Sequence, residues 1–205
     1  MIDHALRRHK EMVLAPIARA VPRGVHPTAF TAVALVPGLG AAIAAGAGAP
    51  ALALGLWLVN RLLDGLDGTL ARRSGRQSER GAYADILADV IVYAAIPLGI
   101  AAGRGDRAAW IAAGALLATF YVNAISWSYL SALLERRGAG ARSRGELTAV
   151  TMPSGLIEGA ETVVLLGLAL AVPAWSVAVM WVMAAGVALS IAQRAVWAAR
   201  RLDPA

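Results

Sequence analysis

Residues 60–89 read NRLLDGLDGTLARRSGRQSERGAYADILAD and connect two long apolar segments of the chain. The stretch contains four aspartates, two on each side of a basic connection: Asp64, Asp67, Asp85 and Asp89. The first two are three residues apart and the last two are four apart, so each pair shares one face of a helix. Because the connection is short, we expect the four carboxylates to gather at one end of a helical bundle.

The rest of the chain is rich in apolar residues, which make up 59% of the sequence, whereas charged residues make up 16%. A soluble domain usually carries about a quarter charged residues. A membrane-spanning helix needs roughly 20 mostly apolar residues, and six segments qualify: 28–48, 50–71, 82–103, 108–134, 154–172 and 174–197. Backbone groups in lipid require helices or a closed barrel, and no segment alternates apolar and polar residues. The sequence therefore predicts an all-α integral membrane protein with six transmembrane helices.

The chain is expected to form a single domain over residues 1–205, with a cytoplasmic interfacial segment at 1–27 and a six-helix bundle at 28–199. Apolar side chains recur at roughly helical spacing within residues 2–21, among basic and acidic ones. This pattern indicates an amphipathic helix that lies on the membrane surface. A frayed cytoplasmic tail is the alternative.

The basic residues predict the orientation of the bundle. They cluster before the first apolar segment, after the second, after the fourth and at the end of the chain, whereas the opposite connections carry only Arg104 and Arg107. Since cationic loops stay in the cytoplasm, both termini and the four aspartates are expected there. The net charge of +6 fits contact with anionic lipid headgroups and needs no nucleic-acid partner.

Four neighbouring carboxylates repel one another, by about 4 kcal/mol for two charges ~4 Å apart even at an effective dielectric of 20. Three kinds of compensation are possible. Nearby arginines form ion pairs, and Arg61, Arg72 and Arg73 are candidates. Protonation is typical of an ion-coupled transporter or channel. Divalent cations prefer oxygen ligands and bind alongside phosphates. The spacing alone leaves ion pairs and metal open.

Small residues accompany the acids and provide room for a bulky ligand near the backbone. With the aspartates they form a pattern: Asp64, two residues, Asp67-Gly68, two residues, Ala71-Arg72, eight residues, Gly81, three residues, Asp85, three residues, Asp89. This pattern resembles the signature of the CDP-alcohol phosphotransferase (CDP-alcohol phosphatidyltransferase) family at every defined position. Eight identities at fixed spacing are far more specific than a short motif. Family members share a six-helix membrane architecture with a cytoplasmic site.

The resemblance implies a transferase that moves a phosphatidyl group from CDP-diacylglycerol to a small alcohol and releases CMP. It implies a pair of Mg²⁺ or Mn²⁺ ions, held by Asp64, Asp67 and Asp85 with a contribution from Asp89, which is also the expected general base. The CDP moiety would contact Asp64, Gly68, Ala71, Arg72 and Gly81. Arg72 would act catalytically near the pyrophosphate. A homodimer is common in the family, and the chain resembles a bacterial inner-membrane branch of it.

The acceptor alcohol is harder to predict. Candidate acceptor-binding residues are Glu158 and Glu161, which share a helix face, and the loop arginines Arg136 and Arg142. Inositol-phosphate-using relatives tend to carry arginines near the two glutamates, so their absence here favours a polyol or an amine-bearing alcohol. Ion pairing across the bundle is the alternative role of the glutamates. For the whole chain, an intramembrane-acid transporter or a catalytically silent scaffold remain the alternatives to an enzyme.

Overall fold

The computed structural model of the chain describes residues 16, 27–75, 78–139 and 155–202. These parts are helical and contain no strand, which confirms the predicted all-α class. The elements are α2 (Pro27–Gly46), α3 (Pro50–Ser74), α4 (Glu79–Arg104), α5 (Arg107–Arg136), α7 (Gly159–Ala171), the 3-10 turn η1 (Pro173–Trp175) and α8 (Ser176–Arg201). The predicted interfacial helix, apart from residue 16, and the cytoplasmic loop with Arg142 lie outside the described residues.

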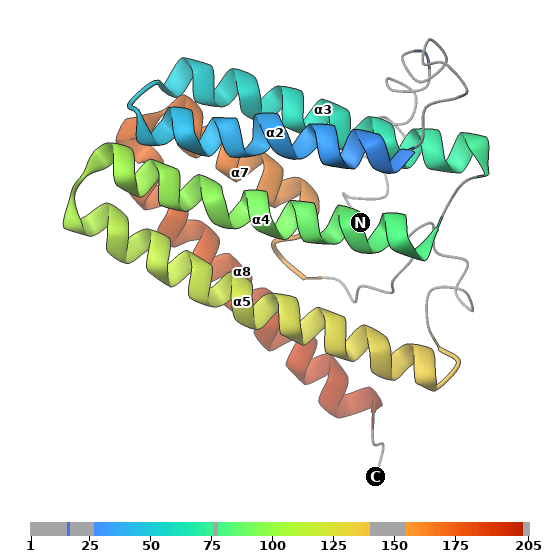
Figure 1. Cartoon of the computed structure of the whole chain (residues 1–205). Helices are drawn as coiled ribbons and strands as arrows, with labels where there is room; N and C mark the ends of the chain where they lie inside the picture. The colour runs from blue at the N-terminus through green and yellow to red at the C-terminus, as the bar shows by residue number, and fades with distance from the viewer. Residues whose placement is uncertain (1–15, 17–26, 76–77, 140–154, 203–205) are drawn as a thin grey trace.

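The helices pack side by side as an elongated bundle (Figure 1). Helix α2 packs against both α3 and α4, α5 packs against α8, and α7 contacts α3 and α8. The helices α4 and α5 and the stretch Pro173–Arg201 are each long and apolar enough to cross a membrane, whereas Thr31–Gly46 and Gly159–Ala171 are shorter apolar helices. The chain is thus an integral membrane protein. That it has six transmembrane helices stays a prediction.

The fifth helix begins later than its apolar pattern predicts. The expected segment is 154–172, but α7 spans only 13 residues, Gly159–Ala171. Glu158 stands at the N-cap, where its side chain accepts a hydrogen bond from the backbone N of Gly155 at 2.9 Å. The backbone N of Glu158 in turn donates to the Glu161 carboxylate at 3.1 Å. These bonds satisfy backbone groups at the helix start, so the preceding residues follow a different path.

The end of the bundle opposite the aspartates is closed by a tight connection between α4 and α5. Gly105 adopts a left-handed conformation with φ of 67°, and the Asp106 carboxylate accepts a hydrogen bond from the backbone N of Ala109 at 2.7 Å. That hydrogen bond and the neighbouring Arg104 lower the pKa of Asp106. Arg104 also donates to the carbonyl of Pro173 at 2.9 Å. This arginine therefore ties the α4–α5 connection to the one between α7 and α8.

Helices α2 and α4 approach so closely that glycine is required at their crossing. A Cβ atom at Gly99 would overlap the backbone carbonyl of Ala42, and one at Gly103 would overlap that of Ala45. Small residues four apart allow such contact between membrane helices. Because the obstacle is backbone rather than a movable side chain, a larger residue forces the helices apart. The crossing thereby fixes α4, the helix that carries Asp85 and Asp89.

We expect Gly99→Ala to lower the unfolding temperature in detergent, because overpacking of this kind costs about 1–3 kcal/mol. The matched control is Gly114→Ala on α5, where an added Cβ meets no atom within 4 Å. That control is expected to be neutral or slightly stabilising, since alanine favours a helix more than glycine does. Equal unfolding temperatures for the two variants would contradict the close crossing.

Candidate functional site

The four aspartates come from the adjoining ends of α3 and α4. Helix α3 ends at Ser74, followed by Gly75 with a left-handed φ of 63°, which is a common way to end a helix. Helix α4 begins after Ser78, whose hydroxyl accepts a hydrogen bond from the backbone N of Gly81 at 3.1 Å. The chain therefore turns back within a few residues, as the short connection predicted. This turn brings the acids of the two helices together.

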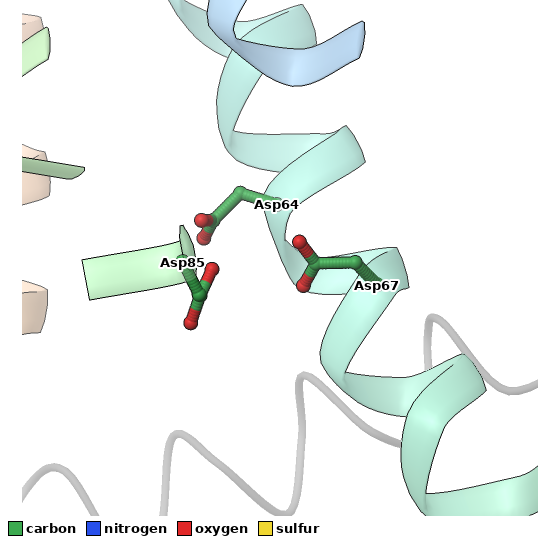
Figure 2. A group of neighbouring side chains, drawn as sticks. All are labelled: Asp64, Asp67 and Asp85. Carbon is green, nitrogen blue, oxygen red and sulfur yellow. The ribbon is translucent and has the colours of Figure 1, made fainter. Parts of the chain in front are cut away.

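Three of the carboxylates form a compact cluster. Asp64, Asp67 and Asp85 each offer one oxygen, and these oxygens all lie within 4.8 Å of one another. Figure 2 shows the three side chains pointing toward a shared space between the helices. Two charges at this separation repel by roughly 3 kcal/mol at an effective dielectric of 20. A cation bound among them would remove that repulsion.

The cluster suits a divalent cation by both chemistry and spacing. Carboxylate oxygens are the ligands that Mg²⁺ prefers, at metal–oxygen distances of about 2.1 Å, so its ligand oxygens lie at most ~4.2 Å apart. The observed limit of 4.8 Å lies close to that value. Asp67 is held in place by Thr31 of α2, whose hydroxyl donates to its carboxylate at 2.7 Å. Asp67 is also buried, with 5% of its surface exposed.

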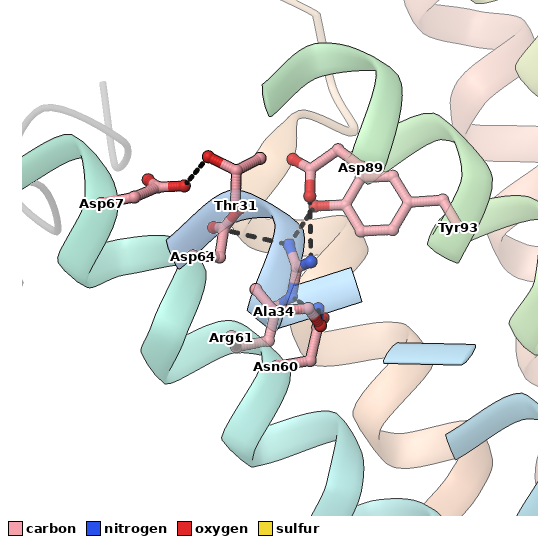
Figure 3. Close-up of polar contacts among 8 residues, drawn as sticks. All are labelled: Thr31, Ala34, Asn60, Arg61, Asp64, Asp67, Asp89 and Tyr93. Atoms are coloured by element: carbon pink, nitrogen blue, oxygen red, sulfur yellow. Dashed lines mark hydrogen bonds and ion pairs between the residues drawn. The ribbon is translucent and has the colours of Figure 1, made fainter. Parts of the chain in front are cut away.

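The fourth aspartate has a different partner. Asp89 accepts a hydrogen bond from the Arg61 guanidinium at 2.9 Å, and the same guanidinium lies 3.7 Å from Asp64 (Figure 3). Asp89 is therefore not one of the three clustered acids, although it lies next to them through Arg61. The spacing left open whether a metal ion or an arginine compensates the acids. A metal ion suits Asp64, Asp67 and Asp85, whereas an arginine ion pair suits Asp89. A direct contribution of Asp89 to metal binding stays a prediction.

The small residues of the motif lie beside the acids on the same helix ends. Gly68 directly follows Asp67, and Gly81 lies four residues before Asp85, on the same face of α4. Gly68, Ala71 and Gly81 are all partly exposed. Arg72 lies in the last turns of α3, but its side chain is not described. The residues predicted to contact the nucleotide therefore lie next to the acid cluster.

The predicted acceptor residues are spread over a wider region. The carboxylates of Glu158 and Glu161 hold the start of α7 through the hydrogen bonds described above. Arg136 stands exposed in the last turn of α5. None of these contacts tests a role in acceptor binding, which stays a prediction.

Sequence reasoning missed a buried arginine on α8. Arg194 has only 5% of its surface exposed, and its guanidinium donates to the Asn123 amide oxygen on α5 at 2.8 Å. Its Nε has no hydrogen-bond partner among the described residues. A single arginine inside the apolar segment 174–197 was the available signal, because charged residues within membrane spans are costly and default to a functional role.

Comparison with known proteins identifies the fold and its chemistry. The sequence model of the CDP-alcohol phosphatidyltransferase family matches residues 25–192. The chain belongs to this family. The resemblance to this family is thereby confirmed, and the predicted reaction class is confirmed with it. This CDP-alcohol phosphatidyltransferase is accordingly a membrane-bound transferase of lipid metabolism.

Individual relatives agree with this assignment. The inner membrane protein YnjF of Escherichia coli (strain K12) is 32% identical over 176 residues, which cover 85% of this chain and 84% of YnjF. The structure of Mycobacterium tuberculosis phosphatidylinositol phosphate synthase with CDP-DAG bound has the same fold, with a TM-score of 0.72 at 24% identity over 90% of this chain and 92% of that one. The same synthase in complex with manganese and citrate gives a TM-score of 0.69 at 24% identity over 90% and 88%.

Proposed function

We propose that this CDP-alcohol phosphatidyltransferase transfers a phosphatidyl group from CDP-diacylglycerol to an alcohol and releases CMP. The observation that carries the proposal is the cluster of Asp64, Asp67 and Asp85, whose oxygens lie within 4.8 Å of one another at the ends of two adjoining helices. A synthase of the same fold has been solved with CDP-DAG bound and in complex with manganese, which supports both the donor and a divalent ion.

Asp64, Asp67 and Asp85 would hold a pair of Mg²⁺ or Mn²⁺ ions, with Asp89 adjoining them. Such ions, when bound, neutralise the pyrophosphate and the charge that develops on departing CMP. Asp89 accepts the proton of the alcohol as the hydroxyl oxygen bonds to the lipid-linked phosphorus. The bond between that phosphorus and the oxygen of CMP breaks, and the products are CMP and a phosphodiester lipid.

The remaining motif residues would bind the donor. We assign the CDP moiety to the backbone-accessible positions Gly68, Ala71 and Gly81 together with Asp64, and the pyrophosphate to Arg72. Small residues allow a nucleotide to lie directly against the helix backbone. Arginine matches phosphate oxygens with several donors in a fixed geometry.

For the acceptor we propose a small polyol or an amine-bearing alcohol, bound from the side of Glu158 and Glu161 with Arg136 and Arg142 at the cytoplasmic surface. The Glu158 carboxylate accepts from the backbone N of Gly155 and the Glu161 carboxylate from that of Glu158, and a carboxylate can accept several hydrogen bonds. Carboxylates recognise hydroxyl and ammonium donors and repel phosphate.

We further propose that residues 1–205 form one domain in the bacterial inner membrane, with six transmembrane helices at 28–199, an interfacial helix within 1–27, and a homodimeric assembly. Both termini and the aspartate cluster would face the cytoplasm, because the basic residues lie at that end. YnjF, which is an inner membrane protein, supports the location. The cytoplasmic face is also the side from which a water-soluble alcohol would enter.

The direct test uses purified full-length protein in detergent with Mg²⁺ or Mn²⁺, CDP-diacylglycerol and a panel of alcohols. We expect CMP release that requires both the metal and one alcohol class, with a new phosphodiester lipid detected by mass spectrometry. Addition of EDTA should stop the reaction, and excess Mg²⁺ should restore it. Failure of the protein to release CMP from every CDP-linked donor would rule out the proposed function.

A further inference from the structure

We propose that Arg61 is a positioning residue of this site, which fixes the Asp89 carboxylate beside the three clustered aspartates. The inference rests on the proposed function, in which Asp89 accepts the proton of the alcohol. Arg61 is not part of the family motif described above, and the sequence indicated only that it lies near the acids. Its role follows from its contacts.

The Arg61 guanidinium bridges the two acidic pairs. One of its terminal nitrogens donates to Asp89 of α4 at 2.9 Å, and the other lies 3.7 Å from Asp64 on its own helix. Only 11% of its side-chain surface is exposed. The charge is therefore largely shielded from solvent and acts on these two acids (Figure 3). Arg61 therefore links Asp89 to the edge of the acid cluster.

Arg61 is itself held from several directions. Its Nε donates to the Asn60 amide oxygen at 2.8 Å, and the Asn60 nitrogen donates to the carbonyl of Ala34 on α2 at 2.8 Å. A terminal nitrogen donates to the Tyr93 hydroxyl at 3.0 Å. The guanidinium carbon lies 4.7 Å from the ring centre of the buried Trp57. Neighbours on α3 and α4, with Asn60 in turn bonded to α2, thus define one position for the guanidinium.

This support is more than an ion pair between helices requires. The guanidinium is planar and lies over Trp57, and two of its nitrogens are hydrogen-bonded to Asn60 and Tyr93. Its third nitrogen therefore points in one direction, toward Asp89, which a lysine ammonium cannot reproduce. A base must lie within hydrogen-bond reach of the proton that it accepts, so control of the Asp89 orientation affects turnover directly. The competing explanation is that Arg61 only joins α3 to α4. The two explanations differ in whether the effects on kcat of substitutions at Arg61 and at Asp89 depend on each other.

A double-mutant cycle distinguishes the positioning role of Arg61 from a purely structural one. It uses Arg61→Gln, Asp89→Asn and the combined variant. We expect Arg61→Gln to lower kcat by about 100-fold, within the range of general-base catalysis, with the KM for CDP-diacylglycerol nearly unchanged. In the Asp89→Asn background the same change should have no further effect, because residues that act as one unit are not additive. An equal loss in both backgrounds would overturn the proposal.

Two further variants serve as controls. Arg61→Lys keeps the charge but loses the fixed geometry, so its kcat should lie between those of the wild type and Arg61→Gln. If Arg61→Gln does not yield folded protein, the cycle is run with Arg61→Lys and the same criterion. The matched control is Arg104→Gln, which removes an ion-paired arginine at the opposite end of the bundle and should leave kcat unchanged.

Metal binding gives a readout that does not depend on turnover. Mn²⁺ affinity is measured by electron paramagnetic resonance on the wild type and Arg61→Gln. Because Arg61 is a cation near Asp64, its removal should leave Mn²⁺ affinity unchanged or raise it, although kcat falls. A lower affinity would mean that Arg61 acts by supporting the metal site, and would overturn its assignment as a positioning residue of the base. This measurement can be made even if the wild type releases no CMP, an outcome that would refute the proposed function itself.

Discussion

Asp85→Asn is expected to abolish CMP release, with a loss of at least about 10³-fold, which corresponds to ~4 kcal/mol of transition-state stabilisation. The substitution keeps the shape of the side chain but removes one of the three charges whose oxygens lie within 4.8 Å of one another. An amide is a poor substitute for a carboxylate as a ligand for Mg²⁺ or Mn²⁺. Turnover with saturating CDP-diacylglycerol and alcohol, over a range of metal concentrations, measures the effect.

The thermal stability of Asp85→Asn distinguishes a metal ligand from an aspartate with a purely structural role. Without metal, Asp85→Asn removes repulsion within the cluster, so its unfolding temperature should be equal to or above that of the wild type. The rise in unfolding temperature on adding Mn²⁺ should be lost. The matched control is Asp106→Asn, the same change at the opposite end of the bundle, which should retain activity. An Asp85→Asn variant with normal metal-dependent turnover would disprove the metal-site assignment.

Asp89→Asn is expected to lower kcat by about 10²–10⁴-fold, the usual contribution of a general base. The amide cannot accept the proton of the alcohol, but it still accepts the hydrogen bond from Arg61 that now holds the carboxylate at 2.9 Å. The helix ends should therefore stay in place, and binding of CDP should persist. Single-turnover kinetics and equilibrium binding of CDP in the presence of Mn²⁺ separate the two effects.

The dependence of CMP release on the alcohol acceptor provides the control for Asp89→Asn. If Asp89 acts on the alcohol, the loss should be confined to the alcohol-dependent release of CMP, with donor binding close to that of the wild type. A variant that releases CMP at the normal rate with the alcohol present would exclude Asp89 as the base. A variant that no longer binds CDP would instead assign Asp89 to the donor or metal site.

The positions of most helices could be predicted from the sequence, because long apolar segments separated by basic or glycine-containing breaks specify membrane helices with little ambiguity. The segment 82–103, for example, corresponds to α4 at Glu79–Arg104. The start of α7 could not be placed in this way. It depends on the hydrogen bonds of Glu158 and Glu161, whereas the apolar pattern continues upstream through Leu156 and Ile157.

The acid cluster was predictable because its spacing determines which residues share a helix face. Asp64, Asp67 and Asp85 meet as the spacing and the short connection required. Arg61 was a candidate ion-pair partner of the acids, but its pairing with Asp89 in particular, 28 positions away on α4, was not predictable. The contact between Arg194 and Asn123 similarly joins residues that are 71 positions apart. Spacing within one helix carries no information about such contacts.

The most direct test of the central claim is the location of manganese in crystals of the full-length protein grown with Mn²⁺ and CDP. Anomalous scattering at the manganese edge identifies the metal independently of any model of the chain. The account predicts two neighbouring peaks held by oxygens of Asp64, Asp67 and Asp85, with Asp89 adjoining them and bonded to Arg61. A peak located elsewhere, or none at all in a preparation that releases CMP with Mn²⁺, would contradict it.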